Sequence, residues 1–280
     1  MDTSKQILLM ILFYITLVLP VQATDTAKEQ RWAKQIAEFL VDGETRWFVA
    51  DGHRFVGIYT PVTRGTPLGA VILLHGRGVH PDWPQVIQPM RTQLPEHGWA
   101  TLSLQMPILD NDASYEDYVP LFSEVPARIQ AGTEFLRQRH FKNVILIGHS
   151  LGANMATDFV ARYHDPSIKG VVGIGMMGKP QPAEYQPLDN VAALLRIHLP
   201  VLDVYGAQTL PVVLRSVDRR AFAVYHTGND YSRQIMINGA NHFYQGHEAE
   251  LVQAVSNWMT GLVNPAPTNQ FVHSGTTQKK

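Results

Sequence analysis

The chain has 280 residues, a formal net charge of −1 at pH 7, and 45% hydrophobic and 17% charged residues. This composition is typical of one well-packed domain, and the near-zero charge gives no sign of a nucleic-acid partner, which would need a basic surface. The absence of cysteine excludes disulfides, thiolate catalysis and cysteine-ligated zinc.

The first residues have the features of an export signal. Lys5 precedes the apolar run ILLMILFYITLVLP (residues 7–20), and small residues at Val21 and Ala23 stand where a signal peptidase reads. We expect residues 1–23 to be removed, and the mature chain to be periplasmic or secreted without stable membrane insertion. An uncleaved anchor is the alternative, although the run is shorter than the ~20 residues of a spanning helix.

The next segments predict a helix and a hairpin. Apolar residues recur at helical spacing over residues 27–41. The stretch TRWFVADGHRFVGIYTP then contains two β-rich segments around Asp51-Gly52, a pair that favours a hairpin turn. We therefore expect two antiparallel strands at the N-terminal edge of a sheet.

Six apolar runs follow, separated by segments of helical length. Runs without alternation of apolar and polar residues are typical of a parallel sheet that is covered on both faces. The pattern predicts an α/β fold with a mostly parallel, doubly wound sheet in a single domain (residues 24–263), and a disordered Pro/Thr-rich tail (residues 264–280). The expected strands are 70–74, 100–104, 144–147, 171–174, 201–205 and 234–237. The expected helices lie near residues 84–96, 121–139, 151–163, 187–197, 210–220 and 247–262.

Ser150 lies in the sequence VILIGHSLGANMA, between a predicted strand and a predicted helix. A serine in such a turn takes a strained conformation, and Gly148 and Gly152 remove side chains where the strand and helix come close. The turn lifts the hydroxyl to the helix N-terminus, where developing negative charge is favoured. The pattern predicts a nucleophile, the alternative being a serine that only caps the helix.

From about Trp47 to Leu262 the chain resembles the α/β-hydrolase superfamily, and GHSLGA is the most specific element of the likeness. The run HGRGVHPDWPQVIQPMRTQLPEHGWATLSLQMP, together with PVLDVYG, also resembles a family of exported bacterial α/β-hydrolase-like proteins of unassigned function. The superfamily implies an α/β-hydrolase fold, an oxyanion-binding loop after the third strand and a catalytic histidine late in the chain.

The loop after the third strand reads HGRG, which is similar to the H-G-x-G pattern of esterases and lipases. Gly76 and Gly78 let the backbone approach a substrate, and the amide groups of Arg77 and Leu151 are the candidate oxyanion donors. A glycine turn that serves only the topology is the alternative. His75 holds a place in the pattern that orders the loop, so we expect it to be structural.

His242 follows the last predicted strand, in the turn-rich sequence NGANHF. A histidine that comes after the nucleophile in the chain matches the order of the hydrolases, so His242 is the candidate general base. His149 lies beside the nucleophile in sequence, but we expect the strand-turn geometry to point it elsewhere.

The third member of a catalytic triad is not evident. In PVLDVYGAQTLP, Thr209 stands where the superfamily carries its acid, and Asp203 is six residues earlier in a buried strand. Some hydrolases place the acid after the sixth strand, where Glu184 is the first carboxylate. Glu184 is therefore the leading candidate, with Asp203, Asp189 and Asp218 as alternatives, and the absence of any carboxylate remains open.

Two metal sites are weaker interpretations. Residues 110–114 begin like a calcium loop, but Tyr115 occupies the sixth position, where glycine is required. His75, His80 and Asp82 resemble a zinc set, although an oxyanion loop explains this segment better. We expect no metal and no cofactor.

These features together predict an exported serine hydrolase that cleaves a small carboxylic ester or thioester. Ser150 would attack, His242 would transfer the proton, and the amides of Arg77 and Leu151 would hold the oxyanion. Because Thr209 occupies the acid position, the alternative is a catalytically degenerate hydrolase-fold protein with a binding or envelope-associated function.

Overall fold

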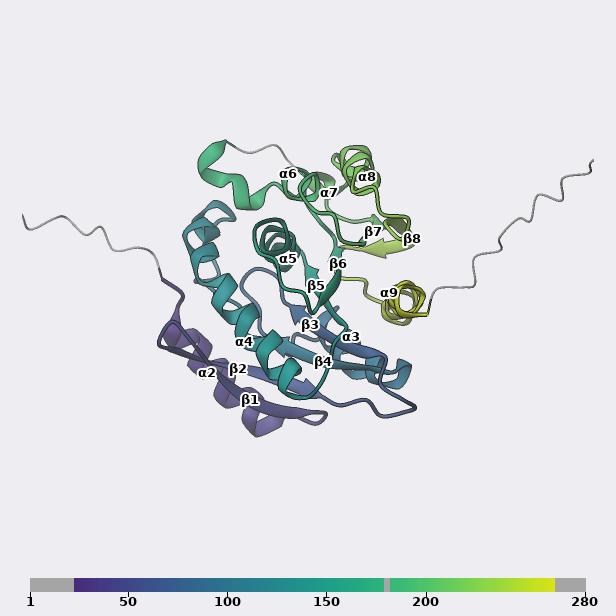
Figure 1. Cartoon of the computed structure of the whole chain (residues 1–280). Helices are drawn as coiled ribbons and strands as arrows, with labels where there is room; N and C mark the ends of the chain where they lie inside the picture. Colours follow the sequence, from purple (N-terminus) through teal and green to yellow (C-terminus); the bar gives the residue numbers. More distant parts are fainter. Residues whose placement is uncertain (1–22, 179–181, 265–280) are drawn as a thin grey trace, which may run out of the picture.

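The apolar runs form one eight-stranded sheet in the computed structural model, which describes residues 23–178 and 182–264. The strands are β1 (Glu44–Ala50), β2 (His53–Thr60), β3 (Gly69–Leu74), β4 (Trp99–Leu104), β5 (Val144–His149), β6 (Ile168–Ile174), β7 (Val201–Gln208) and β8 (Arg233–Asn241). Their order is β1-β2-β4-β3-β5-β6-β7-β8 (Figure 1). The pairs β1–β2 and β2–β4 are antiparallel and the remaining pairs are parallel, which confirms the predicted fold class.

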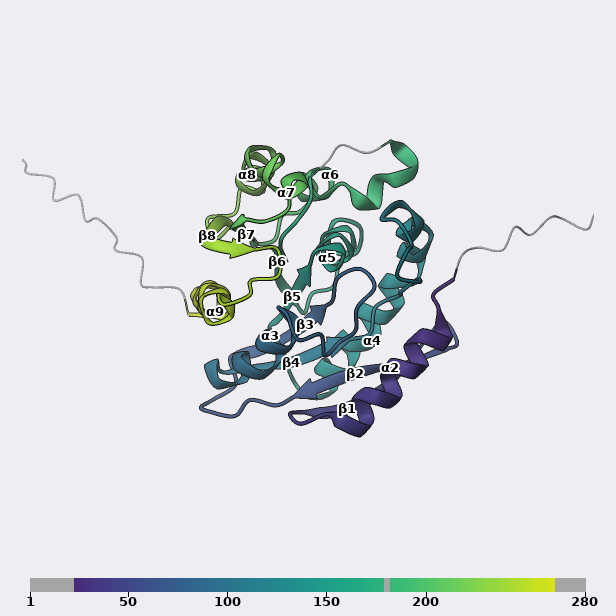
Figure 2. The same cartoon turned by 180° about the vertical axis from the view of Figure 1, so that it is seen from behind.

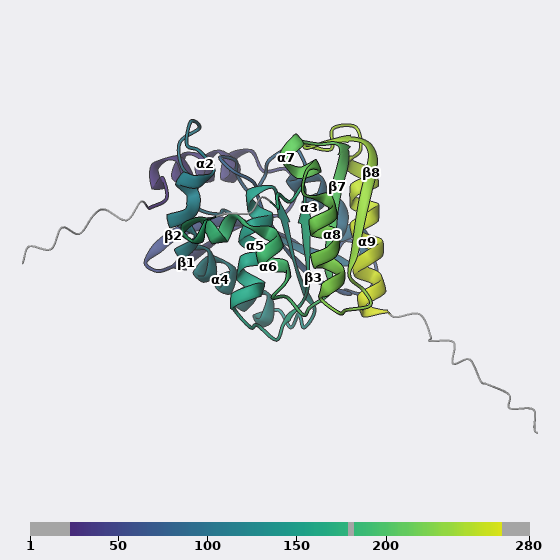
Figure 3. The ribbon, with the colours of Figure 1, turned by 90° about the horizontal axis from the view of Figure 1, so that it is seen from above.

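Helices cover both faces of the sheet. The α-helices are α2 (Thr26–Phe39), α3 (Ile87–Gln93), α4 (Val125–Gln138), α5 (Leu151–Arg162), α6 (Asn190–Leu194), α7 (Pro211–Leu214), α8 (Val217–His226) and α9 (Glu248–Val263), and the 3₁₀ helices are η1 (Leu94–His97), η2 (Glu116–Ser123) and η3 (Ala183–Leu188). α4, α5, α6 and α8 pack over one face, and α2, α3 and α9 over the other (Figures 1 and 2). From above, β1 and β2 lie at one end of the sheet and β8 at the other (Figure 3).

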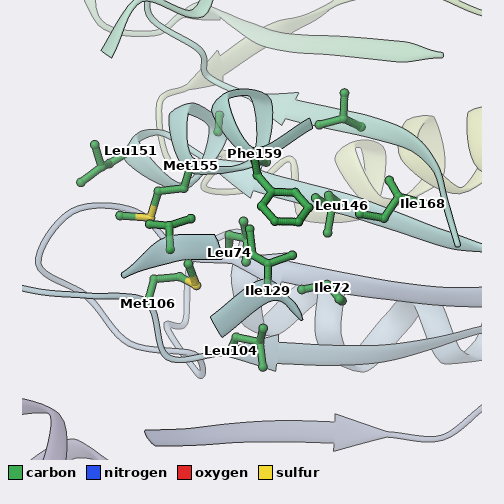
Figure 4. Packing of buried hydrophobic residues seen from close by; sticks show 14 of the residues in the cluster. Ile72, Leu74, Leu104, Met106, Ile129, Leu146, Leu151, Met155, Phe159 and Ile168 are labelled. Carbon is green, nitrogen blue, oxygen red and sulfur yellow. The ribbon is translucent and has the colours of Figure 1, made fainter. Parts of the chain in front are cut away.

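The core consists of two layers because neighbouring strand residues point to opposite faces. In β3, Ile72 belongs to the layer under α4 and α5, whereas Leu73 belongs to the layer under α3 and α9, and both are fully buried. Met155 and Phe159 of α5 point toward the sheet and fill the first layer (Figure 4). Each buried side chain of this size stabilises the fold by ~1.5–3 kcal/mol.

Several boundaries differ from those expected. The predicted helix 84–96 is the shorter α3 followed by η1, and Pro95 stands in the first turn of η1. The predicted helix 210–220 is broken into α7 and α8, which Arg215 and Ser216 separate, and the predicted helix 187–197 is reduced to α6. β8 was expected to end at residue 237, but it continues to Asn241 because Asn241 pairs with Gln208 of β7. The strands β7 and β8 therefore carry their following residues to the same edge of the sheet.

The expected signal peptide and tail lie almost wholly outside the described residues, in 1–22 and 265–280. In the described part of the chain, no helix combines the length and the apolar character that crossing a membrane requires.

Candidate active site

Ser150 occupies a strained turn between β5 and α5. Its backbone has φ 55° and ψ −117°, a positive φ that is uncommon for a residue with a side chain. The turn is tight: a Cβ atom on Gly148 would lie 2.2 Å from the carbonyl oxygen of Gly152. A Cβ atom on Gly152 would lie 2.2 Å from the carbonyl oxygen of Leu74. No other residue type fits at these two positions, so the glycines fix the turn that presents the serine.

The hydroxyl of Ser150 forms a hydrogen bond with the hydroxyl of Tyr115, with 2.8 Å between the oxygens. Burial raises the pKa of Tyr115 above its usual value, so its hydroxyl stays protonated and able to donate. Sequence reasoning did not identify Tyr115 as a site residue. It lies between β4 and η2, in a segment without the periodicity that places a side chain.

His75 fixes the loop that follows β3. The backbone nitrogen of Met106 donates to Nε2 of His75 (2.9 Å), so the ring carries its proton on Nδ1 and donates it to the carbonyl of Gly76 (2.9 Å). The carbonyl of Gly76 and the N–H of Arg77 share one planar peptide group, so His75 sets the direction of the Arg77 N–H. A Cβ atom on Gly76 would lie 3.4 Å from Cβ of Ser150, which places the loop beside the serine.

The two candidate oxyanion amides belong to this loop and to the start of α5. Leu151 is the first residue of α5, and the N–H groups in the first turn of a helix lack acceptors within the helix. Arg77 precedes Gly78, which has φ 70°. The guanidinium of Arg77 donates to the carbonyl of Ala113 and lies 5.8 Å from the ring centroid of Tyr115. The loop is thereby tied to the segment that carries Tyr115.

His242 directly follows β8 and is 6% exposed. Ser150 and His242 both lie beside the turn after β6. The backbone nitrogen of Ser150 donates to the carbonyl of Ile174 (2.9 Å), and a Cβ atom on Gly175 would lie 2.9 Å from Cε1 of His242. His149 does not point the same way as the serine: its Nε2 donates to the carbonyl of His242 (3.0 Å). The structure thus places the candidate nucleophile and base around one turn.

Thr209 is the side-chain partner of the His242 ring. Its hydroxyl oxygen lies 3.0 Å from Nδ1 of His242, and Thr209 is itself 6% exposed. The sequence located Thr209 at the acid position but gave no indication that it would bond to the histidine. The oxygen of a threonine hydroxyl can accept a hydrogen bond from Nδ1–H, which keeps the proton on Nδ1 and leaves Nε2 unprotonated, but it supplies no negative charge.

The carboxylates considered as catalytic acids have other places in the fold. Asp203 is fully buried in an ion pair with Arg220 (2.8 Å), and Asp189 accepts hydrogen bonds from the first turn of α6. Asp218 lies in the first turn of α8. Glu184 belongs to η3, but its side chain is outside the described part of the structure. None of the described carboxylates hydrogen-bonds to His242.

The residues considered as zinc ligands do not form a set. Asp82 pairs with Arg91 (2.7 Å), and the nitrogens of His75 are hydrogen-bonded to the carbonyl of Gly76 and the backbone nitrogen of Met106. Within the described ranges, no group of three or more His, Asp or Glu side chains is arranged to hold a metal ion.

Burial keeps the histidines of this region neutral. Desolvation lowers the pKa of His242 to about 4, and it lowers the pKa values of His75 and His149 to about 3. A carboxylate beside the ring would oppose this effect, because it favours the charged imidazolium. With a hydroxyl in its place, His242 is a weak base that is unprotonated at neutral pH.

We expect the His242 ring to titrate near pH 4, which proton NMR can follow with the resonance assigned through His242→Gln. The unfolded chain binds this proton near pH 6.5, so the folded state loses up to about 3 kcal/mol of stability as the pH falls from about 6.5 to about 4. A His242 resonance that titrates near pH 6.5 in the folded protein would contradict this description of the site.

A family model described as "Protein of unknown function (DUF3530)" matches residues 16–119 and 120–261. A search of curated proteins found no match.

Several solved structures share the fold. Est1E from Butyrivibrio proteoclasticus is 19% identical, with a TM-score of 0.59 over 79% of this chain and 99% of that chain. Dienelactone hydrolase from Anabaena variabilis is 20% identical, with a TM-score of 0.62 over 78% of this chain and 97% of that chain. A soluble variant of monoglyceride lipase from Saccharomyces cerevisiae is 12% identical, with a TM-score of 0.63 over 81% of this chain and 97% of that chain. The chain therefore has the α/β-hydrolase fold and belongs to the family of proteins of unknown function DUF3530.

Proposed function

We propose that the chain is an exported serine hydrolase that cleaves a carboxylic ester or thioester through an acyl-enzyme at Ser150. The observation that carries this proposal is the conformation of Ser150 in its strained turn, with the glycine loop on one side and His242 near the turn after β6. The esterases and hydrolases among the structural neighbours support the same reaction class by their names.

In the proposed mechanism, Oγ of Ser150 attacks the carbonyl carbon while Nε2 of His242 takes the hydroxyl proton. The amides of Arg77 and Leu151 receive the negative charge that develops on the carbonyl oxygen. His242 then gives its proton to the leaving alcohol or thiol. His242 then takes a proton from a water molecule, which attacks the acyl carbon. The bond from this carbon to Oγ breaks, His242 returns the proton to Oγ of Ser150, and the acid is released.

Tyr115 is a further proposed donor to the oxyanion. Its hydroxyl lies 2.8 Å from Oγ of Ser150, so it is close enough to reach an oxygen on the carbon that Oγ attacks. The Arg77 guanidinium lies 5.8 Å from the centroid of the Tyr115 ring, so the glycine loop and the Tyr115 segment are neighbours, which supports this proposal.

The substrate is proposed to be small. The segment between β6 and β7 spans only residues 175–200, which leaves little chain for a lid. Phe243 is 42% exposed and packs edge-on against His242 at 5.4 Å, and Leu210, beside Thr209, is 43% exposed. These apolar surfaces next to the histidine suit a short apolar acyl or alkyl group.

One observation favours a second function, in which this hydrolase-fold protein binds a ligand without catalytic turnover. The described partner of Nδ1 in His242 is a hydroxyl, where a carboxylate would stabilise the imidazolium that forms during catalysis. The two functions differ in whether Ser150 is reactive.

The first test is labelling of the mature chain with a fluorophosphonate probe. We expect the wild type to be labelled and Ser150→Ala to be unlabelled, because the probe reacts only with an activated serine. Ser123→Ala, at an exposed serine that bonds to the carbonyl of Pro120, is the matched control and is expected to label normally. A folded wild type that does not react would reject the hydrolase proposal and favour the binding protein.

The second test concerns Thr209 and the rate of ester cleavage. Thr209→Ser keeps the hydroxyl and is expected to keep kcat within about threefold, whereas Thr209→Val leaves Nδ1 without a partner and is expected to lower kcat by about 10–100-fold. Thr209→Asp adds the missing charge, so it is expected to raise both the pKa of His242 and kcat, the latter by about tenfold or more.

Melting temperatures of the three Thr209 variants control for loss of the fold. Equal kcat values for the Thr209→Val variant and the wild type would show that the threonine does not position the base.

A further inference from the structure

The start of the described chain is fixed in the fold at Thr24. Ala23 is exposed, whereas Thr24 is only 7% exposed. The backbone nitrogen of Asp25 donates to the carbonyl of Ile108 (2.8 Å), and the backbone nitrogen of Ile108 donates to the hydroxyl of Thr24 (2.8 Å). The chain therefore passes from solvent into a defined site between Ala23 and Thr24.

Two carboxylates accept hydrogen bonds from Thr24 at this site. Its backbone nitrogen donates to Oε1 of Glu124 at 3.0 Å, across a sequence separation of 100 residues. Its hydroxyl donates to Oε1 of Glu29 at 2.5 Å. Glu29 is 3% exposed and the Glu124 side chain is 25% exposed, so the contact with Glu29 is buried and the contact with Glu124 is partly open to water.

The charges around Thr24 do not balance. Arg128, which is 1% exposed, pairs with both Glu29 and Glu124 at 3.0 Å. His53 contacts the other oxygen of Glu29 at 2.8 Å, but it carries a charge only when protonated. Two carboxylates therefore share one guanidinium, and a buried charge such as that of Glu29 is costly unless it is paired.

We propose that this site binds the α-ammonium group of a mature chain that begins at Thr24. A signal peptidase would hydrolyse the bond between Ala23 and Thr24, with water giving a hydroxyl to the carbonyl carbon of Ala23 and a proton to the nitrogen of Thr24. The new amine takes a further proton at neutral pH and supplies the missing positive charge. The nitrogen already lies at hydrogen-bonding distance from Glu124, so processing changes its charge without requiring it to move.

The hydrogen bonds of Thr24 and Asp25 with Ile108 also hold one end of the segment that carries Tyr115. Lys28 in α2 donates from Nζ to the carbonyl of Leu109 (2.8 Å), and the backbone nitrogen of Leu109 donates to the hydroxyl of Tyr118 (3.0 Å). The chain from Ile108 onward then leads to Tyr115. A bound N-terminus therefore stabilises the start of this segment whether or not Ser150 is catalytic.

In the first step of the test, the full chain is expressed in a bacterial host and the exported protein is purified. The intact mass of this protein is expected to be that of residues 24–280. A chain with a free amine at Thr24 is then compared by thermal melting with a chain that begins at Gln22. We expect the Thr24 chain to melt about 3–8 °C higher at pH 7. The advantage should disappear as the pH rises through the folded pKa of the amine, which a carboxylate partner raises above the usual ~7.8.

Two substitutions distinguish binding of the amine at this site from a general effect of chain length on the melting temperature. Glu124→Gln removes the proposed partner and is expected to abolish the difference between the two chains. Glu134→Gln, at an exposed ion pair in α4, the helix that begins directly after Glu124, is expected to preserve it. If Glu124→Gln does not fold, NMR titration of the Thr24 amine in the wild type replaces it, with a raised pKa expected.

A different mature N-terminus, equal melting temperatures, a difference that survives Glu124→Gln, or an amine with its ordinary pKa would each overturn the proposal. None of these readouts requires enzymatic activity, so the result is independent of the function proposed for Ser150.

Discussion

The close approach of the β5–α5 turn to the end of β3 is the constraint on which the site depends. The carbonyl oxygen of Leu74 would lie 2.2 Å from any Cβ atom on Gly152, so the helix can begin here only because that residue is glycine. The loop of His75 and Gly76 continues directly from Leu74. One backbone contact therefore sets both the strain at Ser150 and the place of the glycine loop beside it.

The second determinant of the site is the extension of β7 and β8 beyond their apolar runs. Pairing between Gln208 and Asn241 carries both strands to the edge where Thr209 and His242 follow. The neutral contact between these two residues fits their burial, since an ion pair would have to be desolvated. In the proposed mechanism, the neutral hydroxyl of Thr209 stabilises the imidazolium of His242 less than a carboxylate would. We therefore expect a modest catalytic rate.

Much of the fold could be predicted because each buried strand corresponds to a continuous apolar run in the sequence. The residues from Val144 to Ile147 identify β5, and glycines on both sides of Ser150 identify the turn that follows. The position of His242 followed from chain order. Helix ends were predicted less well. Residues 210–220 were expected to form one helix, but they form α7 and the start of α8, and no residue type between them marks the break.

The contacts that sequence reasoning missed join segments far apart in the chain. The sequence showed that Thr209 replaces an acid, but the bond to His242 depends on the register of two strands. Tyr115 reaches Ser150 from a segment without regular spacing, and Thr24 meets Glu124 across 100 residues. Such contacts leave no local pattern, because each partner alone has an ordinary sequence environment.

In the proposed mechanism, Ser150 attacks a carbonyl whose oxygen is held by the glycine loop, the start of α5 and Tyr115. A crystal structure of the protein after reaction with a phosphonate ester tests this most directly, because the phosphonyl oxygen takes the place of the oxyanion. We expect phosphorus bonded to Oγ of Ser150, with the phosphonyl oxygen within ~3 Å of the Arg77 and Leu151 nitrogens and the Tyr115 hydroxyl. A phosphonyl oxygen turned away from these donors, or no adduct at Ser150, would contradict it.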